Sequence, residues 1–156
     1  MNPWISNTFI DSCAFDPKYS PEDESSREIF RLYAEEQLGL MIAHSNLKEL
    51  EHPSTPDWVK AEARASIYTI KTDRTPNELT LLNAIHAQIA GNGKPEQMRS
   101  DAEHLYEATK YGSYFVTTDK RLLRHASELL KLCGLNVVLP SDFLSVVQNS
   151  RNPTRR

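Results

Sequence analysis

One stretch of the sequence, residues 113–121 (SYFVTTDKR), constrains the fold more than any other part of the chain. Its aromatic and β-branched run from Tyr114 to Val116 predicts a buried strand, and two threonines and an aspartate separate that strand from a helical pattern. In an open parallel sheet, ligands bind in the crevice beyond the carboxyl ends of the strands. Asp119 therefore stands where a functional group is expected.

Short apolar runs and helical patterns alternate along the rest of the chain. Strands are predicted over residues 8–11, 40–43, 66–71, 114–116 and 136–139. Helices are predicted over residues 21–38, 47–51, 56–63, 76–90, 95–110 (or 100–110), 120–132 and 141–148. This alternation predicts an α/β protein with a parallel sheet and helices on both faces.

Two of the predicted helices have well-defined ends and apolar faces. Thr75 and Glu78 have the spacing of a capping box ahead of residues 76–90, and Gly134 ends the helix at 120–132. In the first helix the residues expected to face the core are Leu79, Leu82, Ile85 and Ile89. In the second they are Leu122, Leu123, Ala126, Leu129 and Leu130.

Length and composition fit a single domain, which we expect to span residues 1–149 and to precede a disordered basic tail at 150–156. No stretch approaches the roughly 18 apolar residues of a membrane span, so no membrane partner is expected. The N-terminus lacks the pattern of a secretion signal, and Cys13 and Cys133 have no metal-like spacing. We therefore expect a cytoplasmic protein with free thiols.

The net charge of −3 is unevenly distributed. Residues 1–98 hold nine Lys/Arg and fifteen Asp/Glu, whereas residues 99–156 hold nine and six. A mildly acidic chain lacks the overall basic footprint of a nucleic-acid-binding protein. Local basic patches stay open as an alternative, around Lys120, Arg121 and Arg124 or in the tail at Arg151, Arg155 and Arg156.

Four carboxylates from separate segments are expected at one edge of the sheet. Asp11 ends the first predicted strand, Glu49 lies one short turn beyond the second, and Asp119 follows the fourth. Asp101 lies near the start of the helix that leads into the fourth strand, and that helix begins at the same edge. Two carboxylates about 4 Å apart repel by roughly 4 kcal/mol at an effective dielectric of 20, so either some of the four stay protonated or a cation holds them.

The ligand type indicates the cation and its chemistry. Oxygen-only ligands select hard cations, so Mg²⁺ or Mn²⁺ is the expected cofactor. Such an ion activates a bound water and neutralises charge on phosphoryl oxygens, as phosphodiester hydrolysis requires. Each acid also has a structural alternative: a helix N-cap for Asp119, a partner of an Asn46 cap for Glu49, a first-turn acid for Asp101 and a turn residue for Asp11.

These residues occur in a characteristic order. Phe9-Ile10-Asp11-Ser12 is followed by residues 45–49, then by Ser100-Asp101-Ala102 heading a helix, and then by residues 115–119. The ordered set resembles the PIN-domain family of metal-dependent ribonucleases and covers nearly the whole chain. The resemblance implies a five-stranded sheet in the order 3-2-1-4-5, and an acidic quartet formed by Asp11, Glu49, Asp101 and Asp119.

In many members of that family, including the toxins of bacterial toxin–antitoxin modules, such a site cuts RNA with Mg²⁺ or Mn²⁺. By this resemblance Asp11, Asp101 and Asp119 would bind the metal directly, and Glu49 would bind it through water or position the attacking hydroxide. The implied partners are an RNA substrate, an antitoxin-type protein and a second copy of the chain. The products would carry a 5′-phosphate and a 3′-hydroxyl.

Neighbouring polar residues are assigned supporting roles. Thr117, Thr118 and Ser12 would orient Asp119 or a water, although two β-forming threonines can simply finish a strand. Lys120 and Arg121 would clamp substrate phosphates, with solvated helix charges as the alternative. His104, one helical turn from Asp101, is expected to be a surface histidine, with a supporting role beside the metal ligands as the alternative.

Two other functions stay open. One is a catalytically silent PIN-like module that binds RNA or protein. The other is a phosphohydrolase with Asp11 as an aspartyl nucleophile, which would usually have a second Asp two positions later, where Cys13 stands here.

Overall fold

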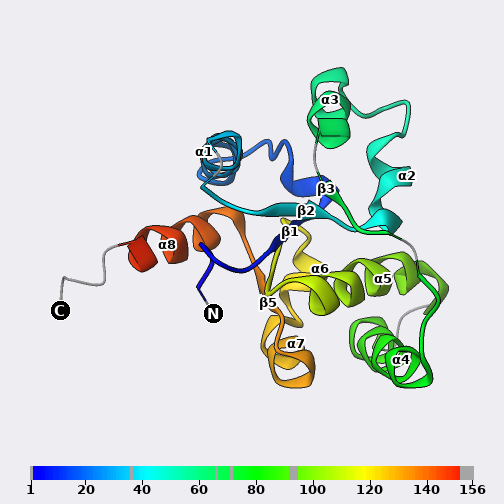
Figure 1. Ribbon diagram of the computed structural model, residues 1–156. Coiled ribbons are helices and arrows are strands. Elements are labelled where there is room, and N and C mark those ends of the chain that lie inside the picture. The colour runs from blue at the N-terminus through cyan, green and yellow to red at the C-terminus, as the bar shows by residue number, and fades with distance from the viewer. Residues whose placement is uncertain (1, 36, 66, 71, 92–94, 152–156) are drawn as a thin grey trace.

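The computed structural model describes residues 2–35, 37–65, 67–70, 72–91 and 95–151, and its centre is a parallel sheet flanked by helices (Figure 1). Most of the sheet is formed by four strands of three residues each, which are β2 (Leu40–Ile42), β1 (Thr8–Ile10), β4 (Tyr114–Val116) and β5 (Asn136–Val138), in that spatial order. A two-residue edge strand, β3 (Ile67–Tyr68), pairs with β2, so the complete order is β3-β2-β1-β4-β5. The predicted α/β class with a parallel sheet is confirmed.

The pleat of the sheet divides the core into two halves. Successive side chains of a strand point to opposite faces, so each three-residue strand contributes to both. One face presents Phe9, Met41, Phe115 and Val137. The other presents Ile10, Leu40, Ile42, Tyr114 and Val116. Both faces are apolar because helices cover both, as is usual for parallel sheets.

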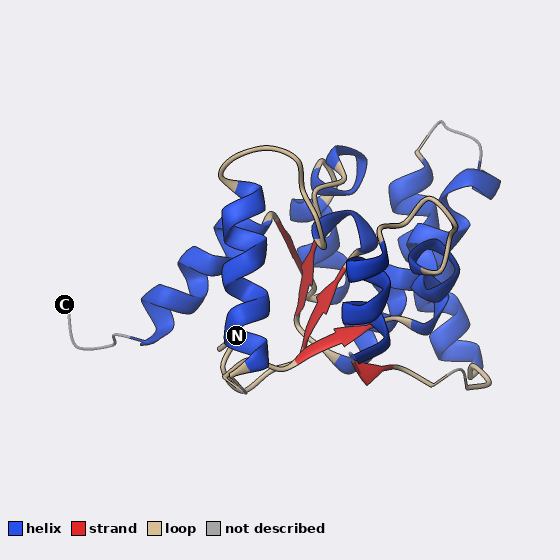
Figure 2. Cartoon of the chain, turned by 90° about the horizontal axis from the view of Figure 1, so that it is seen from above, coloured by secondary structure: helices blue, strands red, loops and turns tan. Residues whose placement is uncertain are grey.

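The α-helices form the two outer layers (Figure 2). Residues of α4 (Pro76–Ala90), α5 (Pro95–Tyr111), α6 (Lys120–Leu123) and α7 (Ala126–Cys133) pack into the half of the core that contains Phe9. The half that contains Ile10 is covered by residues of α1 (Glu22–Ala34), α2 (Leu47–Leu50), α3 (Asp57–Ala65) and α8 (Pro140–Arg151). Two short 3₁₀ helices, η1 (Ser12–Ala14) and η2 (His44–Asn46), follow β1 and β2.

Local signals at helix ends were predicted well. The capping box at Thr75 and Glu78 is confirmed, with both reciprocal hydrogen bonds present. Gly134 ends α7 at φ +73°, a left-handed conformation that glycine adopts at no steric cost. Gly112 meets a different requirement, since a Cβ there would lie 2.6 Å from the Asn7 carbonyl oxygen. It lets the turn before β4 pass close to the start of β1.

Several predicted boundaries are wrong. The helix expected over 120–132 is two helices separated by a turn at Arg124 and His125, and the rotation between them leaves Leu130 47% exposed. Leu79, expected in the core, is 45% exposed near the start of α4. Helix α1 ends at Ala34 and not at residue 38, and the strand expected over 66–71 has only two residues, 66 and 71 lying outside the described part.

The structure of the C-terminal end was only partly predicted. Helix α8 continues through Arg151, so residues 150 and 151 are helical and do not begin a disordered tail; residues 152–156 lie outside the described part. In the described ranges, no helix has both the length and the apolar content that crossing a bilayer requires.

Candidate functional site

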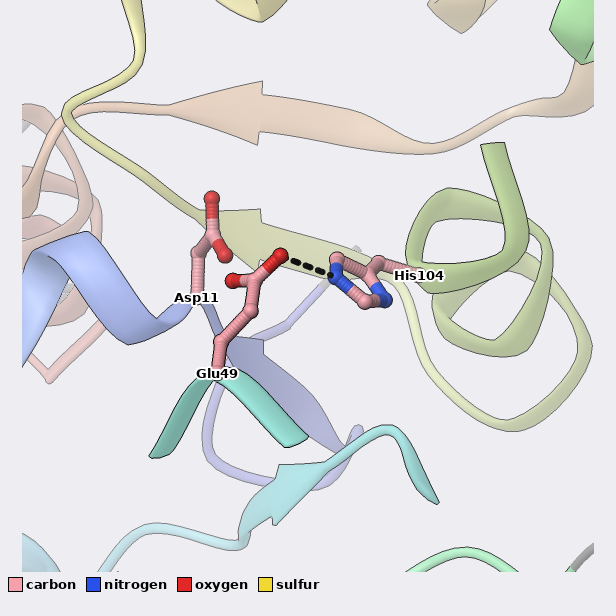
Figure 3. A group of neighbouring side chains, drawn as sticks. All are labelled: Asp11, Glu49 and His104. Carbon is pink, nitrogen blue, oxygen red and sulfur yellow. Dashed lines mark hydrogen bonds and ion pairs between the residues drawn. The ribbon is translucent and has the colours of Figure 1, made fainter. Parts of the chain in front are cut away.

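The carboxyl ends of β1, β2 and β4 deliver side chains to one edge of the sheet. Asp11 directly follows β1, and Glu49 lies on α2 beyond β2. Asp119 follows β4, while α5 brings its own polar residues to the same place. Figure 3 shows Asp11, Glu49 and His104 turned toward one another. We call the set Asp11, Glu49, Asp101, His104 and Asp119 the acidic site.

Asp11 is held by hydrogen bonds from several segments. It is only 4% exposed, and its Oδ1 accepts from the backbone N–H of Ser12 at 2.9 Å and from Asn46 Nδ2 at 3.3 Å. Its Oδ2 accepts from Thr117 Oγ1 at 2.8 Å and from Cys13 Sγ at 3.4 Å. The side chain of Asn46 makes no capping hydrogen bond to α2. Glu49 is therefore not the partner of an Asn46 cap, which was the structural alternative predicted for it. These donors fix the carboxylate before any ligand binds.

Glu49 has a different partner on each oxygen. Ser12 Oγ donates to Oε2 at 2.7 Å, and His104 Nε2 lies 3.4 Å from Oε1. The hydrogen bond from His104 outweighs partial burial and, together with that from Ser12, lowers the pKa of Glu49. Glu49 is therefore a carboxylate at neutral pH, and its side chain remains 44% exposed to an incoming molecule.

The prediction that His104 lies at the surface is wrong. Its side chain is completely buried, and Ser45 Oγ lies 2.7 Å from Nδ1. Burial by itself would lower the pKa of the imidazole, but the hydrogen bond to Glu49 and the charges of Asp11, Glu49 and Asp101 outweigh it and raise that pKa. The signal that could have found His104 was its spacing of four residues from Ala108, which is buried on the same helix.

Asp101 and Asp119 are joined through one guanidinium. Arg121 Nη2 lies 2.8 Å from Asp119 Oδ2 and 3.6 Å from Asp101 Oδ2. Burial, with the negative charge of Asp11, raises the pKa of Asp101 to about 6. Burial would also raise the pKa of Asp119, but hydrogen bonds from Arg121 outweigh it and lower that pKa. Asp101 lies beyond the first turn of α5, which begins at Pro95, so the first-turn alternative does not apply.

The supporting residues differ in what they contact. Thr117 is buried, donates to Asp11 and accepts from the Asp119 backbone N–H at 3.0 Å, so it links two acids. Thr118 donates to the Cys13 carbonyl at 3.3 Å, and among the described residues it makes no hydrogen bond to any of the acids. Asp119 caps α6 by accepting from the Arg121 N–H at 2.9 Å, so the predicted N-cap alternative is present. Lys120 is exposed beside it.

Cys13 takes part in the same network. Desolvation around the sulfur, and then the charge of Asp11, raise the pKa of this thiol to about 11. The thiol is therefore protonated at neutral pH and can donate to Asp11. A hollow of about 320 Å³ opens beside it, lined by Ser12, Cys13, Glu49, Leu50 and Val59 among others.

The geometry suits a divalent cation. One carboxylate oxygen each of Asp11 and Glu49 and one ring nitrogen of His104 lie within 4.8 Å of one another. Asn46 Oδ1, buried next to Asp11, has no hydrogen-bond partner in the described part of the chain. Carboxylate oxygens with an imidazole nitrogen form a donor set that first-row divalent metals accept.

No protein-family model matches the chain, and no curated protein matches its sequence.

Proposed function

We propose that the chain is a divalent-metal-dependent endoribonuclease that hydrolyses RNA phosphodiester bonds at the acidic site. The observation that carries the proposal is the meeting of Asp11, Glu49 and His104 within 4.8 Å at the carboxyl edge of a parallel sheet, with Asp101 and Asp119 alongside. Acids this close together are tolerated where protonation or nearby positive charge offsets their repulsion, and a divalent cation would supply such charge. The ordered motifs that resemble PIN-domain ribonucleases supply the substrate class.

The residues that would hold Mg²⁺ or Mn²⁺ are Asp11, Asp101 and Asp119, with Glu49 and His104 beside them. When bound, such an ion supplies charge neutralisation at the phosphoryl oxygens and an acidified water. Thr117 supports this set by fixing Asp11 and Asp119 at once. Arg121 already neutralises Asp101 and Asp119, and its exposed guanidinium is suited to a phosphate oxygen as well.

Glu49 is the residue best placed to act on the attacking water. Ser12 and His104 engage its two oxygens and its pKa is low, so it orients water more readily than it retains a proton. His104, held by Ser45, stabilises the charge on Glu49. In-line attack at phosphorus would leave a 5′-phosphate and a 3′-hydroxyl. The toxin role, the antitoxin-type partner and the homodimer rest on the resemblance alone.

Calorimetric titration with Mn²⁺ is the first test. The wild type should bind the ion, whereas Asp11→Asn and Asp119→Asn should weaken binding at least tenfold, and Asp142→Asn, an exposed acid of α8, should match the wild type. Asp11→Asn and Asp119→Asn should also lose cleavage of single-stranded RNA, whereas Asp142→Asn should retain it.

The possible outcomes separate the alternatives. Absence of Mn²⁺ binding in both the wild type and Asp119→Asn would favour the catalytically silent PIN-like module, which needs no tight metal site. Cleavage that survives Asp11→Asn, or that needs no divalent ion, would overturn the proposed nuclease mechanism. A trapped phosphoaspartate at Asp11 would instead favour the phosphohydrolase.

A further inference from the structure

A pocket of about 640 Å³ lies against the acidic site and is lined by three cations, Lys48, Arg74 and Arg99. We call it the basic pocket. Lys48 belongs to α2, Arg74 to the segment before α4, and Arg99 to α5. Three separate segments thus place positive charge around one hollow in a chain whose net charge is −3. Its volume is in the range of pockets that hold small ligands.

The basic pocket shares a wall with the acidic site. Ser45 and Ser100 line the pocket, and their hydroxyls lie 2.7 Å and 3.5 Å from the two ring nitrogens of His104. His104 in turn contacts Glu49. A single side chain therefore separates the pocket from the acids, and an extended ligand can reach both.

Among the described residues, the pocket cations lack the close ion pairs that several other cations of the chain make. Arg31, Arg64 and Arg121 each pair with a carboxylate at 2.9 Å or less. Within the described ranges, by contrast, no ion pair joins Lys48, Arg74 or Arg99 to an acid. The charge of a paired cation is partly neutralised by its carboxylate, whereas the charges of these three are available to an anion.

Two contacts restrain the walls of the pocket. The guanidinium of Arg74 lies 5.3 Å from the centre of the Tyr106 ring, a cation–π contact that limits its motion. His44, which also lines the pocket, has its Nδ1 3.2 Å from Glu107 Oε1 and 3.3 Å from Thr69 Oγ1. A pre-ordered wall loses less conformational entropy when a ligand binds.

Two carboxylates, Glu96 and Glu103, also line the pocket. Three cations against two acids leave a small positive excess. Such a balance suits an anion with one charge per unit, such as the phosphodiester linkage, better than a compact, multiply charged anion. Removal of one of these acids should therefore strengthen anion binding, whereas removal of one of the cations should weaken it.

We propose that the basic pocket binds the phosphodiester backbone of single-stranded RNA beside the scissile bond. This inference rests on the proposed function for the identity of the substrate. Arginine and lysine contacts to phosphates position a nucleic acid without reading its sequence. The pocket thereby sets the register in which the strand crosses the acidic site.

The test is fluorescence anisotropy with a labelled single-stranded RNA in EDTA, which prevents metal-dependent cleavage. The double variant Lys48→Ala/Arg99→Ala should bind at least tenfold more weakly, and the slope of log K against log salt should fall by about 0.7 for each phosphate that is no longer neutralised. Glu103→Gln should bind more tightly. Lys131→Ala, an exposed cation on α7, is the matched control and should leave binding unchanged.

The outcomes distinguish this inference from the nuclease proposal. Unchanged RNA affinity in the double variant, with metal-dependent cleavage intact, overturns the pocket assignment and leaves the nuclease standing. Weaker RNA binding in a chain that never cleaves supports the pocket and removes the nuclease. If inorganic phosphate or an oligo-glutamate binds with the same sensitivity to the variants while RNA does not, the pocket serves another anion and the inference fails. Lys48→Arg/Arg99→Lys should retain wild-type affinity, which separates loss of charge from misfolding.

Discussion

Arg121 shows how one side chain can change the metal affinity of the acidic site. Its Nη2 contacts both Asp119 and Asp101, so it supplies positive charge where a divalent cation would also bind. The guanidinium and the metal should therefore compete for the same two carboxylates, even though Arg121 would assist later in holding the substrate.

We expect Arg121→Gln to bind Mn²⁺ about two- to fivefold more tightly, because a surface ion pair contributes up to about 1 kcal/mol and about 1.4 kcal/mol corresponds to tenfold. RNA affinity should fall in the same variant. Calorimetry with Arg124→Gln as the control would measure the effect. Weaker Mn²⁺ binding would show that Arg121 supports the metal and does not compete with it.

Asp101 should make stability depend on pH. Its pKa is raised from 3.8 to about 6, so the folded state holds this proton more tightly than the unfolded state does. Stability should therefore fall as pH rises from about 4 through about 6. Asp101→Asn removes this effect and should raise the melting temperature at pH 7 but not at pH 4, in thermal scans with EDTA. Equal shifts at both pH values would contradict the assignment.

At the scale of single elements, α4 shows which contacts can be predicted from the local sequence. Thr75 accepts from the Glu78 N–H at 3.2 Å, and the Glu78 carboxylate accepts from the Thr75 N–H at 3.1 Å. Tyr106 and Lys110 of α5 also contact that carboxylate, so the cap joins the two helices. The local part of this arrangement was visible in the sequence, whereas the contacts from α5 were not.

Thr75→Ala should lower the free energy of unfolding by about 1 kcal/mol, the usual effect of losing a helix cap. Thr80→Ala, at an exposed threonine in the same helix, is the matched control and should change stability by much less. Urea unfolding of the two variants would measure the difference. Equal effects would mean that the cap contributes nothing beyond the change in residue type.

At the scale of the whole molecule, the two outer layers depend on the sheet between them. Phe143 of α8 is completely buried and meets the Tyr114 ring edge-on, with 5.4 Å between ring centres. This contact anchors α8 to β4 on the face that carries Ile10. The acidic site lies at the edge of the sheet, so its geometry depends on the strands more than on this helix.

Phe143→Ala should cost about 3–5 kcal/mol of unfolding free energy, as usual for a large buried ring. Leu130→Ala, at a residue that is 47% exposed, should cost far less. Below its melting temperature, the Phe143 variant should still bind Mn²⁺ like the wild type. Loss of metal binding in a folded Phe143 variant would show that the helix layer positions the site.

Some features could be predicted from the sequence because they depend on neighbours along the chain. The alternation of strands and helices, the capping box at Thr75 and the Gly134 terminus are of this kind, since each is set by propensity or by hydrogen bonds within a few residues. The placement of Asp11 and Asp119 at one edge also follows, because parallel strands share a direction. The roles of these acids in catalysis stay predictions.

Other features were decided only by tertiary structure. His104 is buried because η2 and α2 bring Ser45 and Glu49 against α5, residues that lie 59 and 55 positions away in sequence. The contact of Arg121 with Asp101, and the basic pocket formed by three segments, likewise exist only after the chain has folded. Sequence periodicity specifies which face of a helix is apolar. It does not specify which polar groups of distant segments meet, because that depends on how the layers pack.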